Sequence, residues 1–203
     1  MQRQYTVSIC KTACDSINEA AELGIIEKKD GHVSINIDKF HHTITIEDNG
    51  TGIKADKAEM TLKYIAHSKK KKESAAGFYG IGRLVGGGYC KQLSFTTSAQ
   101  GEDVASEMVF DMDLIREILE DDEDNSSASE VIHKVTPFRN DIAEEPQKHY
   151  FKVVLKDILL LVSAKTLIPN RSLDCCRVMR LKITGIWGAD CKSADGCLSS
   201  LEL

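Results

Sequence analysis

The stretch HVSINIDKFHHTITIEDNGTGI, residues 32–53, joins two alternating runs of residues to a turn that contains two glycines. Ile35 and Ile37 alternate with polar residues in the first run, and Ile44 and Ile46 do so in the second. Because successive side chains of a strand point to opposite faces, each run predicts a strand with one buried face. The short KFHH link between the runs predicts a hairpin, and EDNGTGI predicts a turn at its end.

Helices are expected on both sides of this hairpin. Residues 5–23 carry apolar side chains at spacings of three and four, and Gly24 would end that helix. Residues 54–68 repeat the pattern with Ala58 and Leu62. Further strands are predicted at KQLSFTTSA, EMVFDMDLI, VIHKVTPF and YFKVVLKDI, the second of them passing into a short helix. This order predicts an α+β fold, with helices on one face of a mainly antiparallel sheet.

The composition excludes several classes of protein. The chain has 203 residues, 42% hydrophobic and 28% charged, which is typical of one soluble globular domain. We expect a cytoplasmic protein without membrane contact, because the start shows no signal peptide and the longest apolar run, ILLLV, cannot span a bilayer. The net charge of −5 makes direct nucleic-acid binding unexpected. The seven cysteines lack the C-x-x-C pairs of a zinc or redox site.

A second glycine-rich segment, ESAAGFYGIGRLVGGGYC, follows a run of four lysines and begins at Glu73. It does not match a P-loop, because Gly82 is followed by Arg83 where that motif needs lysine. It does not match a dinucleotide fingerprint either, because Val85 stands where the third glycine would be. Taken alone, the segment could be a simple turn between a helix and a strand.

The two glycine motifs, EDNGTGI at 47–53 and GFYGIG at 77–82, follow a helix with a polar face. This arrangement resembles the GHKL ATPases, the group that contains the gyrase B subunit, the ninety-kilodalton heat-shock chaperone, histidine kinases and MutL. The resemblance covers about residues 5–157 and is strongest to prokaryotic chaperone-like and microrchidia-like ATP-binding proteins. It implies the Bergerat fold, a two-layer α/β sandwich with a mixed, mainly antiparallel sheet, and it implies binding of ATP with Mg²⁺.

The first motif is the candidate adenine site. A carboxylate at a strand end, Asp48, can accept a hydrogen bond from the amino group of adenine, where guanine presents a carbonyl. Gly50 and Gly52 would let the backbone pass close to the purine ring. Asn49 would lie in the same site or serve the turn. The relatives support the adenine contact with a threonine on a late strand, which KHYFKVVL lacks, so we expect water or Thr97 to support Asp48.

The second motif is the candidate phosphate site. Its glycines allow main-chain N–H groups to point into one concavity, and a helix that begins near Arg83 would add its positive N-terminal end. Residues 66–79 would form a lid whose lysines reach the terminal phosphates. The residues predicted to contact the nucleotide here are Ser68, Lys69, Gly77, Tyr79, Gly80, Ile81, Gly82 and Arg83. Gly86 to Gly88 would soften the helix that follows.

The first helix departs from the relatives, which place a water-activating glutamate four residues before a magnesium-binding asparagine. Counting back from Asn18 reaches Cys14, which is not a base. A shift by one residue makes Asp15 the candidate catalytic base and Glu19 the magnesium ligand, with Asn18 still in reach of the metal. The alternative is an ordinary solvated acidic face.

We therefore predict an ATP-binding domain at 1–157 and a tail of uncertain structure at 158–203, from a truncated or interrupted continuation. The expected function is a conformational module of a chaperone-like or MutL-like ATPase that binds Mg²⁺-ATP as a monomer and hydrolyses it slowly. We expect it to act with a protein partner or with C-terminal domains that are missing here. The alternatives are a histidine-kinase catalytic domain and a non-hydrolysing ATPase remnant that serves as an interaction domain.

Overall fold

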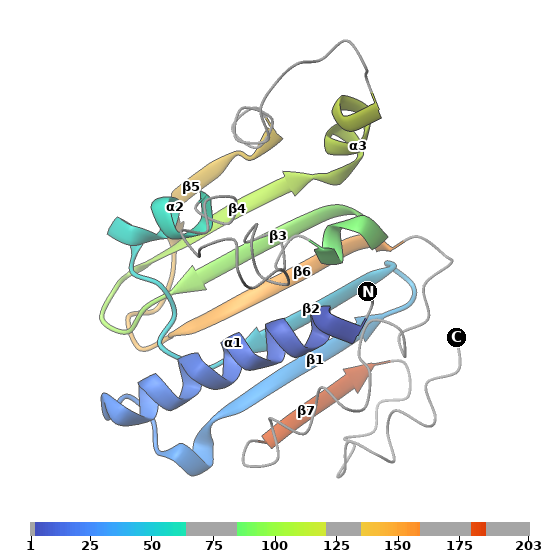
Figure 1. Ribbon diagram of the computed structural model, residues 1–203. Helices are drawn as coiled ribbons and strands as arrows, with labels where there is room; N and C mark the ends of the chain where they lie inside the picture. The colour runs from blue at the N-terminus through green and yellow to red at the C-terminus, as the bar shows by residue number, and fades with distance from the viewer. Residues whose placement is uncertain (1–2, 64–84, 121–134, 159–179, 186–203) are drawn as a thin grey trace, which may run out of the picture.

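The computed structural model describes residues 3–63, 85–120, 135–158 and 180–185, which form one sheet with helices packed against it (Figure 1). The elements in chain order are α1 (Arg3–Glu22), the 3-10 helix η1 (Lys28–Asp30), β1 (His32–Asp38), β2 (Thr43–Asp48), α2 (Ala55–Lys63), the 3-10 helix η4 (Val85–Tyr89), β3 (Cys90–Ser98), β4 (Val104–Asp111), α3 (Met112–Glu120), β5 (Phe138–Ala143), β6 (Tyr150–Ile158) and β7 (Arg180–Gly185).

Across these residues the sheet has seven strands in the order β5-β4-β3-β6-β2-β1-β7. β1 and β2 form the predicted hairpin, and every neighbouring pair is antiparallel except β1 with β7, which is parallel. The predicted α+β class and the mixed, mainly antiparallel sheet are therefore confirmed.

One face of the sheet is apolar because the register aligns its inward-pointing residues in rows. A central row, read across β1, β2, β6, β3 and β4, contains Ile35, Ile46, Val153, Phe95 and Met108. The helices cover this face: Ile17 of α1 packs in a cluster with Val33, and Leu62 of α2 belongs to the main core. In Figure 1, α1 lies across β1 and β2.

The other face of the sheet is polar. Lys152 lies 3.0 Å from Glu47 on the neighbouring strand, and Arg139 lies 2.8 Å from Glu107. These partly exposed ion pairs stabilise only weakly, since solvent screens them. The contrast between the two faces makes the domain a two-layer sandwich, in which any pocket of the apolar face lies between the helices and the sheet.

Two local predictions differ from the structure within the described residues. Of the strand expected at 131–138, residues 131–134 lie outside those residues, and β5 begins only at Phe138, because Pro137 has no N–H to donate to a ladder. Most of β5 was not predicted because it is an edge strand whose side chains are mostly exposed, so its sequence does not alternate between apolar and polar residues. The helix expected near Arg83 is seen within the described residues only as the five-residue η4, which passes directly into β3.

The C-terminal part of the chain contributes to the same sheet. Arg180 pairs with His32, and the parallel register continues to Gly185 beside Ile37. Six residues of the tail predicted as a separate region thus form an edge strand of this sheet. Within the described residues, no helix combines the length and the apolar character needed to cross a membrane.

Candidate functional site

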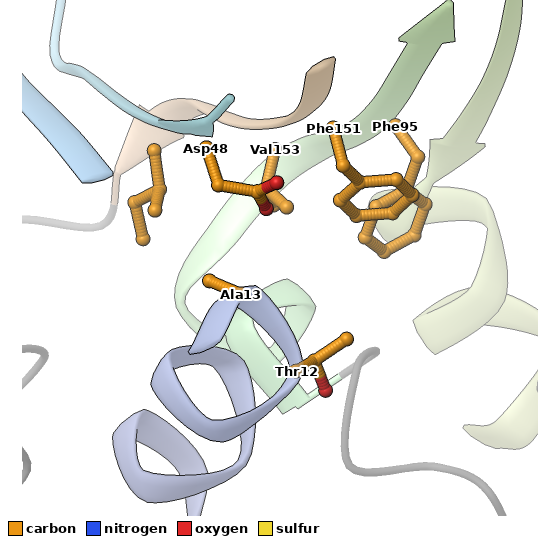
Figure 2. A pocket seen from close by; sticks show the side chains of 7 residues that line it. Thr12, Ala13, Asp48, Phe95, Phe151 and Val153 are labelled. Atoms are coloured by element: carbon orange, nitrogen blue, oxygen red, sulfur yellow. The ribbon is translucent and has the colours of Figure 1, made fainter. Parts of the chain in front are cut away.

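A pocket opens between α1 and the apolar face of the sheet, at the end of β2 (Figure 2). The empty space in and above it amounts to about 400 Å³, a volume that includes open solvent. Its walls are Thr12, Ala13, Ile46, Asp48, Phe95, Phe151 and Val153. The rings of Phe95 and Phe151 lie 5.8 Å apart and give the pocket an aromatic wall. Asp48 is the only charged residue among these seven.

Asp48 is buried at the last position of β2, with 6% of its surface exposed. Burial raises the pKa of its carboxyl group to about 7, and the neighbouring charge of Glu47 acts in the same direction. Hydrogen bonds from the Gly50 N–H, 3.0 Å away, and from the Ser16 side chain partly oppose this shift. At neutral pH the group is therefore partly protonated, and a ligand that donates a hydrogen bond would favour the carboxylate.

Helix α1 turns hydroxyl groups, rather than acids, toward this site. Thr12 and Ala13 line the pocket directly. Ser16, one turn after Thr12, accepts a hydrogen bond from the Thr51 N–H at 3.1 Å, in addition to its bond with Asp48. Residues four apart lie on one side of a helix, so Thr12 and Ser16 form the pocket-facing pair of α1.

The predicted catalytic and metal residues of α1 are not among the residues that line the pocket. Asp15 and Glu19 are exposed, and Asn18 is half-buried. Around the helix axis, Asp15 is turned about 100° and Asn18 about 200° from Ser16, whereas Glu19 lies only about 60° from it. The roles of all three in hydrolysis and Mg²⁺ binding stay predictions.

The turn after Asp48 is held by contacts from distant parts of the chain. The Asn49 side chain accepts a hydrogen bond from the His32 N–H at 2.7 Å and donates to a carbonyl before β1. The Thr97 hydroxyl accepts from the Ile53 N–H at 2.8 Å and donates to a carbonyl of β6. Asn49 therefore stabilises the turn. Thr97 donates its only hydroxyl proton to β6, so it cannot donate to Asp48. The shape of the turn is set before any ligand arrives.

The two glycines of this turn are required by the protein itself. A Cβ at Gly50 would lie 2.0 Å from the Ser16 hydroxyl oxygen. Gly52 has a φ of 63°, and a Cβ there would lie 1.9 Å from the Ser98 carbonyl oxygen. We predicted that a purine ring would leave no room for a side chain at these two positions. The packing of α1 and β3 already leaves no room for one.

The residues of the predicted phosphate site lie outside the described residues. They are Ser68, Lys69, Gly77, Tyr79, Gly80, Ile81, Gly82 and Arg83. Their roles stay predictions.

Several pocket residues were not predicted. Phe151 pairs with Asp48 across β6 and β2, and Phe95 and Val153 lie in the next row. The strand alternation that put Ile46 inward also puts Asp48 inward, and the same rule applied to β6 could have found Phe151 and Val153. Thr12 could have been found as the neighbour of the buried Ala13 on the helix.

The chemistry of the pocket lining is simple. Apolar and aromatic side chains surround one buried carboxyl group, so the pocket offers surface for stacking together with a hydrogen-bond acceptor. In the described part of the chain, no group of three or more His, Cys, Asp and Glu side chains could hold a metal ion. Fold and pocket together define the class: a two-layer α+β domain suited to bind an adenine nucleotide.

Comparison with known families agrees with this class. A protein-family model described as Histidine kinase-, DNA gyrase B-, and HSP90-like ATPase matches residues 15–141, well over half of the 203-residue chain. The chain belongs to this family of ATP-binding ATPase domains. No curated protein matches the chain.

Proposed function

We propose that this domain binds ATP with the adenine ring in the pocket between α1 and the sheet. The observation that carries the proposal is the buried Asp48 carboxylate among apolar and aromatic side chains, already oriented by two hydrogen-bond donors. Asp48 would accept the amino hydrogen of adenine and would meet the carbonyl of guanine unfavourably. Phe151 and Val153, from the sheet, would contact the ring.

We further propose that hydrolysis is slow. The hydroxyl groups of Thr12, which lines the pocket, and Ser16, which bonds to Asp48, are too weakly basic to act as general bases at neutral pH. Asp15 remains our candidate for orienting the attacking water, with Glu19 or Asn18 for Mg²⁺. The exposed position of Asp15 supports a low rate, since a general base must be held within hydrogen-bond reach of its proton.

The physiological role that we infer is a conformational module of the chaperone-like or MutL-like kind, in which ATP occupancy matters more than turnover. A second candidate is an ATP-binding domain that does not hydrolyse at all. The pocket-facing Thr12 and Ser16 favour this second candidate, because neither side chain offers a carboxylate.

Titration calorimetry with a nonhydrolysable ATP analogue, with and without Mg²⁺, tests binding. We expect Asp48→Ala to weaken the affinity by about 30-fold, because it removes a hydrogen bond to a charged group. Asp103→Ala, which alters an exposed carboxylate in the β3–β4 connection, is the matched control and should bind like wild type. No heat from wild type, or equal affinity for GTP and ATP analogues, would contradict the proposal.

Phosphate release measures hydrolysis. We expect wild type to turn over well below about 1 s⁻¹. If Asp15 acts on the water, Asp15→Asn abolishes this release while leaving analogue binding unchanged. If neither protein releases phosphate, the domain binds ATP without hydrolysing it, which is the second candidate function. A wild-type rate above about 1 s⁻¹ would contradict both candidates.

A further inference from the structure

The peptide group that joins Gly50 to Thr51 is held at both ends. Its carbonyl oxygen lies 2.7 Å from the His149 Nδ1 atom, and its N–H donates to the Ser16 hydroxyl oxygen at 3.1 Å. A carbonyl oxygen can only accept, so Nδ1 is the donor of the first bond. His149 belongs to the connection between β5 and β6, whereas Ser16 belongs to α1. The turn after Asp48 is therefore fixed between that connection and the helix.

These contacts lead to the buried carboxyl group of the pocket. The Ser16 oxygen accepts the Thr51 N–H, so its own proton is available for the bond with Asp48, which favours the carboxylate. The Gly50 N–H is the second donor to Asp48, at 3.0 Å. Hydrogen bonds arranged in such a chain polarise and strengthen one another. A change at His149 therefore reaches Asp48 through one peptide group and one hydroxyl group.

His149 is itself held in place by its neighbours in the sequence. Lys148 lies 2.9 Å from one carboxylate oxygen of Glu144, and the Tyr150 hydroxyl donates to the other oxygen at 2.9 Å. Glu144 thus binds the residues on both sides of His149. Because side chains alternate along a strand, the half-buried His149 lies on the same face of the sheet as Phe151, which lines the pocket. The fold of this connection therefore directs the imidazole ring at the turn.

We propose that His149 is a positioning residue for adenine recognition, which acts on Asp48 through the Gly50–Thr51 peptide group. The inference rests on the proposed ATP binding. It assigns His149 no contact with the nucleotide, since this residue is not among the seven that line the pocket. Without the His149 bond, the two donors to Asp48 should be less well oriented. The carboxyl group should then accept the adenine amino hydrogen less strongly.

The test measures adenosine and guanosine binding by titration calorimetry on wild type, His149→Ala and His149→Asn. Adenosine carries no phosphate, so its binding reports the base site alone. We expect His149→Ala to weaken adenosine binding by about fivefold and to lower the preference over guanosine by a similar factor. His149→Asn should bind adenosine within about twofold of wild type, because its amide N–H group is attached to Cγ, as is the Nδ1–H group of histidine.

The pH profile separates this role from a merely structural one. Neither alanine nor asparagine ionises at position 149, so a difference between the two variants reports Asp48. The midpoint of the pH dependence of adenosine affinity should lie at a higher pH in His149→Ala, because donors that are less well oriented favour the carboxylate less. In His149→Ala combined with Ser16→Ala, the loss should be smaller than the sum of the single losses, since both residues act through one chain of bonds.

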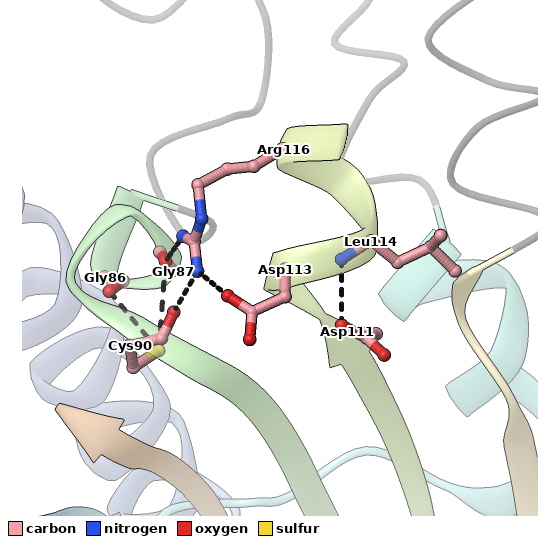
Figure 3. Close-up of polar contacts among 7 residues, drawn as sticks. All are labelled: Gly86, Gly87, Cys90, Asp111, Asp113, Leu114 and Arg116. Atoms are coloured by element: carbon pink, nitrogen blue, oxygen red, sulfur yellow. Dashed lines mark hydrogen bonds and ion pairs between the residues drawn. The ribbon is translucent and has the colours of Figure 1, made fainter. Parts of the chain in front are cut away.

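Two control variants remove contacts of the same kind elsewhere. His41→Ala removes a histidine whose Nδ1 atom lies 2.6 Å from Asp38, at the other end of the hairpin strand that carries Asp48. Arg116→Gln removes a guanidinium group that donates to the Gly87 carbonyl at 3.3 Å and joins α3 to η4 (Figure 3). Neither His41 nor Arg116 lines the pocket, so both controls should bind adenosine like wild type.

His149→Leu keeps the inference testable if His149→Ala does not fold, because it retains most of the volume and lacks the donor. It should lose as much adenosine affinity as His149→Ala. Unchanged affinity in both variants, no recovery in His149→Asn, equal pH midpoints, additive losses with Ser16→Ala, or an equal loss in the controls would overturn the positioning role. Wild type that binds neither adenosine nor the ATP analogue would instead overturn the proposed function.

Discussion

Among the described residues, the turn after β2 and the 3-10 helix η4 both contain glycines, lie at opposite ends of the sheet, and are held by different contacts. In the turn after β2, Gly50 and Gly52 are enclosed by a helix side chain and by backbone, and the buried Asp48 lies beside them. In η4, Gly87 meets only the end of a flexible methionine, and Gly88 meets nothing. Glycines that look alike in sequence thus differ in what they do, because tertiary neighbours decide whether a Cβ can be accommodated.

The largest effect is expected at Gly52. Gly52→Ala combines a left-handed backbone with a collision against the Ser98 carbonyl oxygen, so we expect a loss of at least about 3 kcal/mol in the free energy of unfolding. Gly24→Ala is the matched control: its φ is 71°, but nothing lies within 4 Å of its Cβ position. It should cost only about 1 kcal/mol. Urea denaturation followed by circular dichroism would measure both, and equal losses would refute the collision.

The buried charge in the first turn predicts a pH-dependent stability. The pKa of Asp48 rises from 3.8 to about 7 on folding, so the folded state holds a proton that the unfolded state has lost. Stability therefore falls as pH rises from about 4 to about 7 and then levels off. The free energy of unfolding of Asp48→Asn, relative to that of wild type, should be about 2 kcal/mol more favourable at pH 8 than at pH 5. A constant difference between the two proteins, measured by urea denaturation, would contradict the buried charge.

The same titration should appear in ligand binding. Adenosine is the suitable probe because it carries no phosphate that titrates. The ionised Asp48 accepts the adenine amino hydrogen more strongly, so affinity should fall by about tenfold between pH 8 and pH 6. The groups that act on the pKa of Asp48 include the charged Glu47, on the opposite face of the strand, and the neutral hydroxyl of Ser16. Calorimetry on Asp48→Asn should show no such pH dependence; the same slope in both proteins would assign it to another group.

The smallest effect is expected in η4. Gly87→Ala should cost about 1 kcal/mol in unfolding free energy, since Met112 must move away from the new methyl group. Gly88→Ala, into open space, should change stability by less than about 0.5 kcal/mol. Equal costs at the two positions, measured by urea denaturation, would mean that Met112 does not constrain this turn.

Much of the fold was predictable because periodicity reports burial directly. The alternation of β1 and β2 and the three-and-four spacing of α1 found those elements, and Asp48 was found because it ends an alternating strand. β5 was missed because edge strands with exposed side chains need no apolar pattern. On α1, Thr12 lines the pocket and Ser16 bonds to Asp48, and neither was predicted, whereas Asp15 and Glu19 were chosen by residue type and their roles stay predictions.

By itself, the sequence determined the α+β class, the hairpin, the glycine turn and the carboxylate that ends its second strand, because these depend on local periodicity and backbone preference. Only the tertiary structure decided which side of α1 meets the pocket, because the roll of a helix is set by the packing of Ala13 and Ile17 on the sheet. It also decided the surroundings of Gly87. Met112 and Arg116, both distant in sequence, contact the turn that contains this glycine.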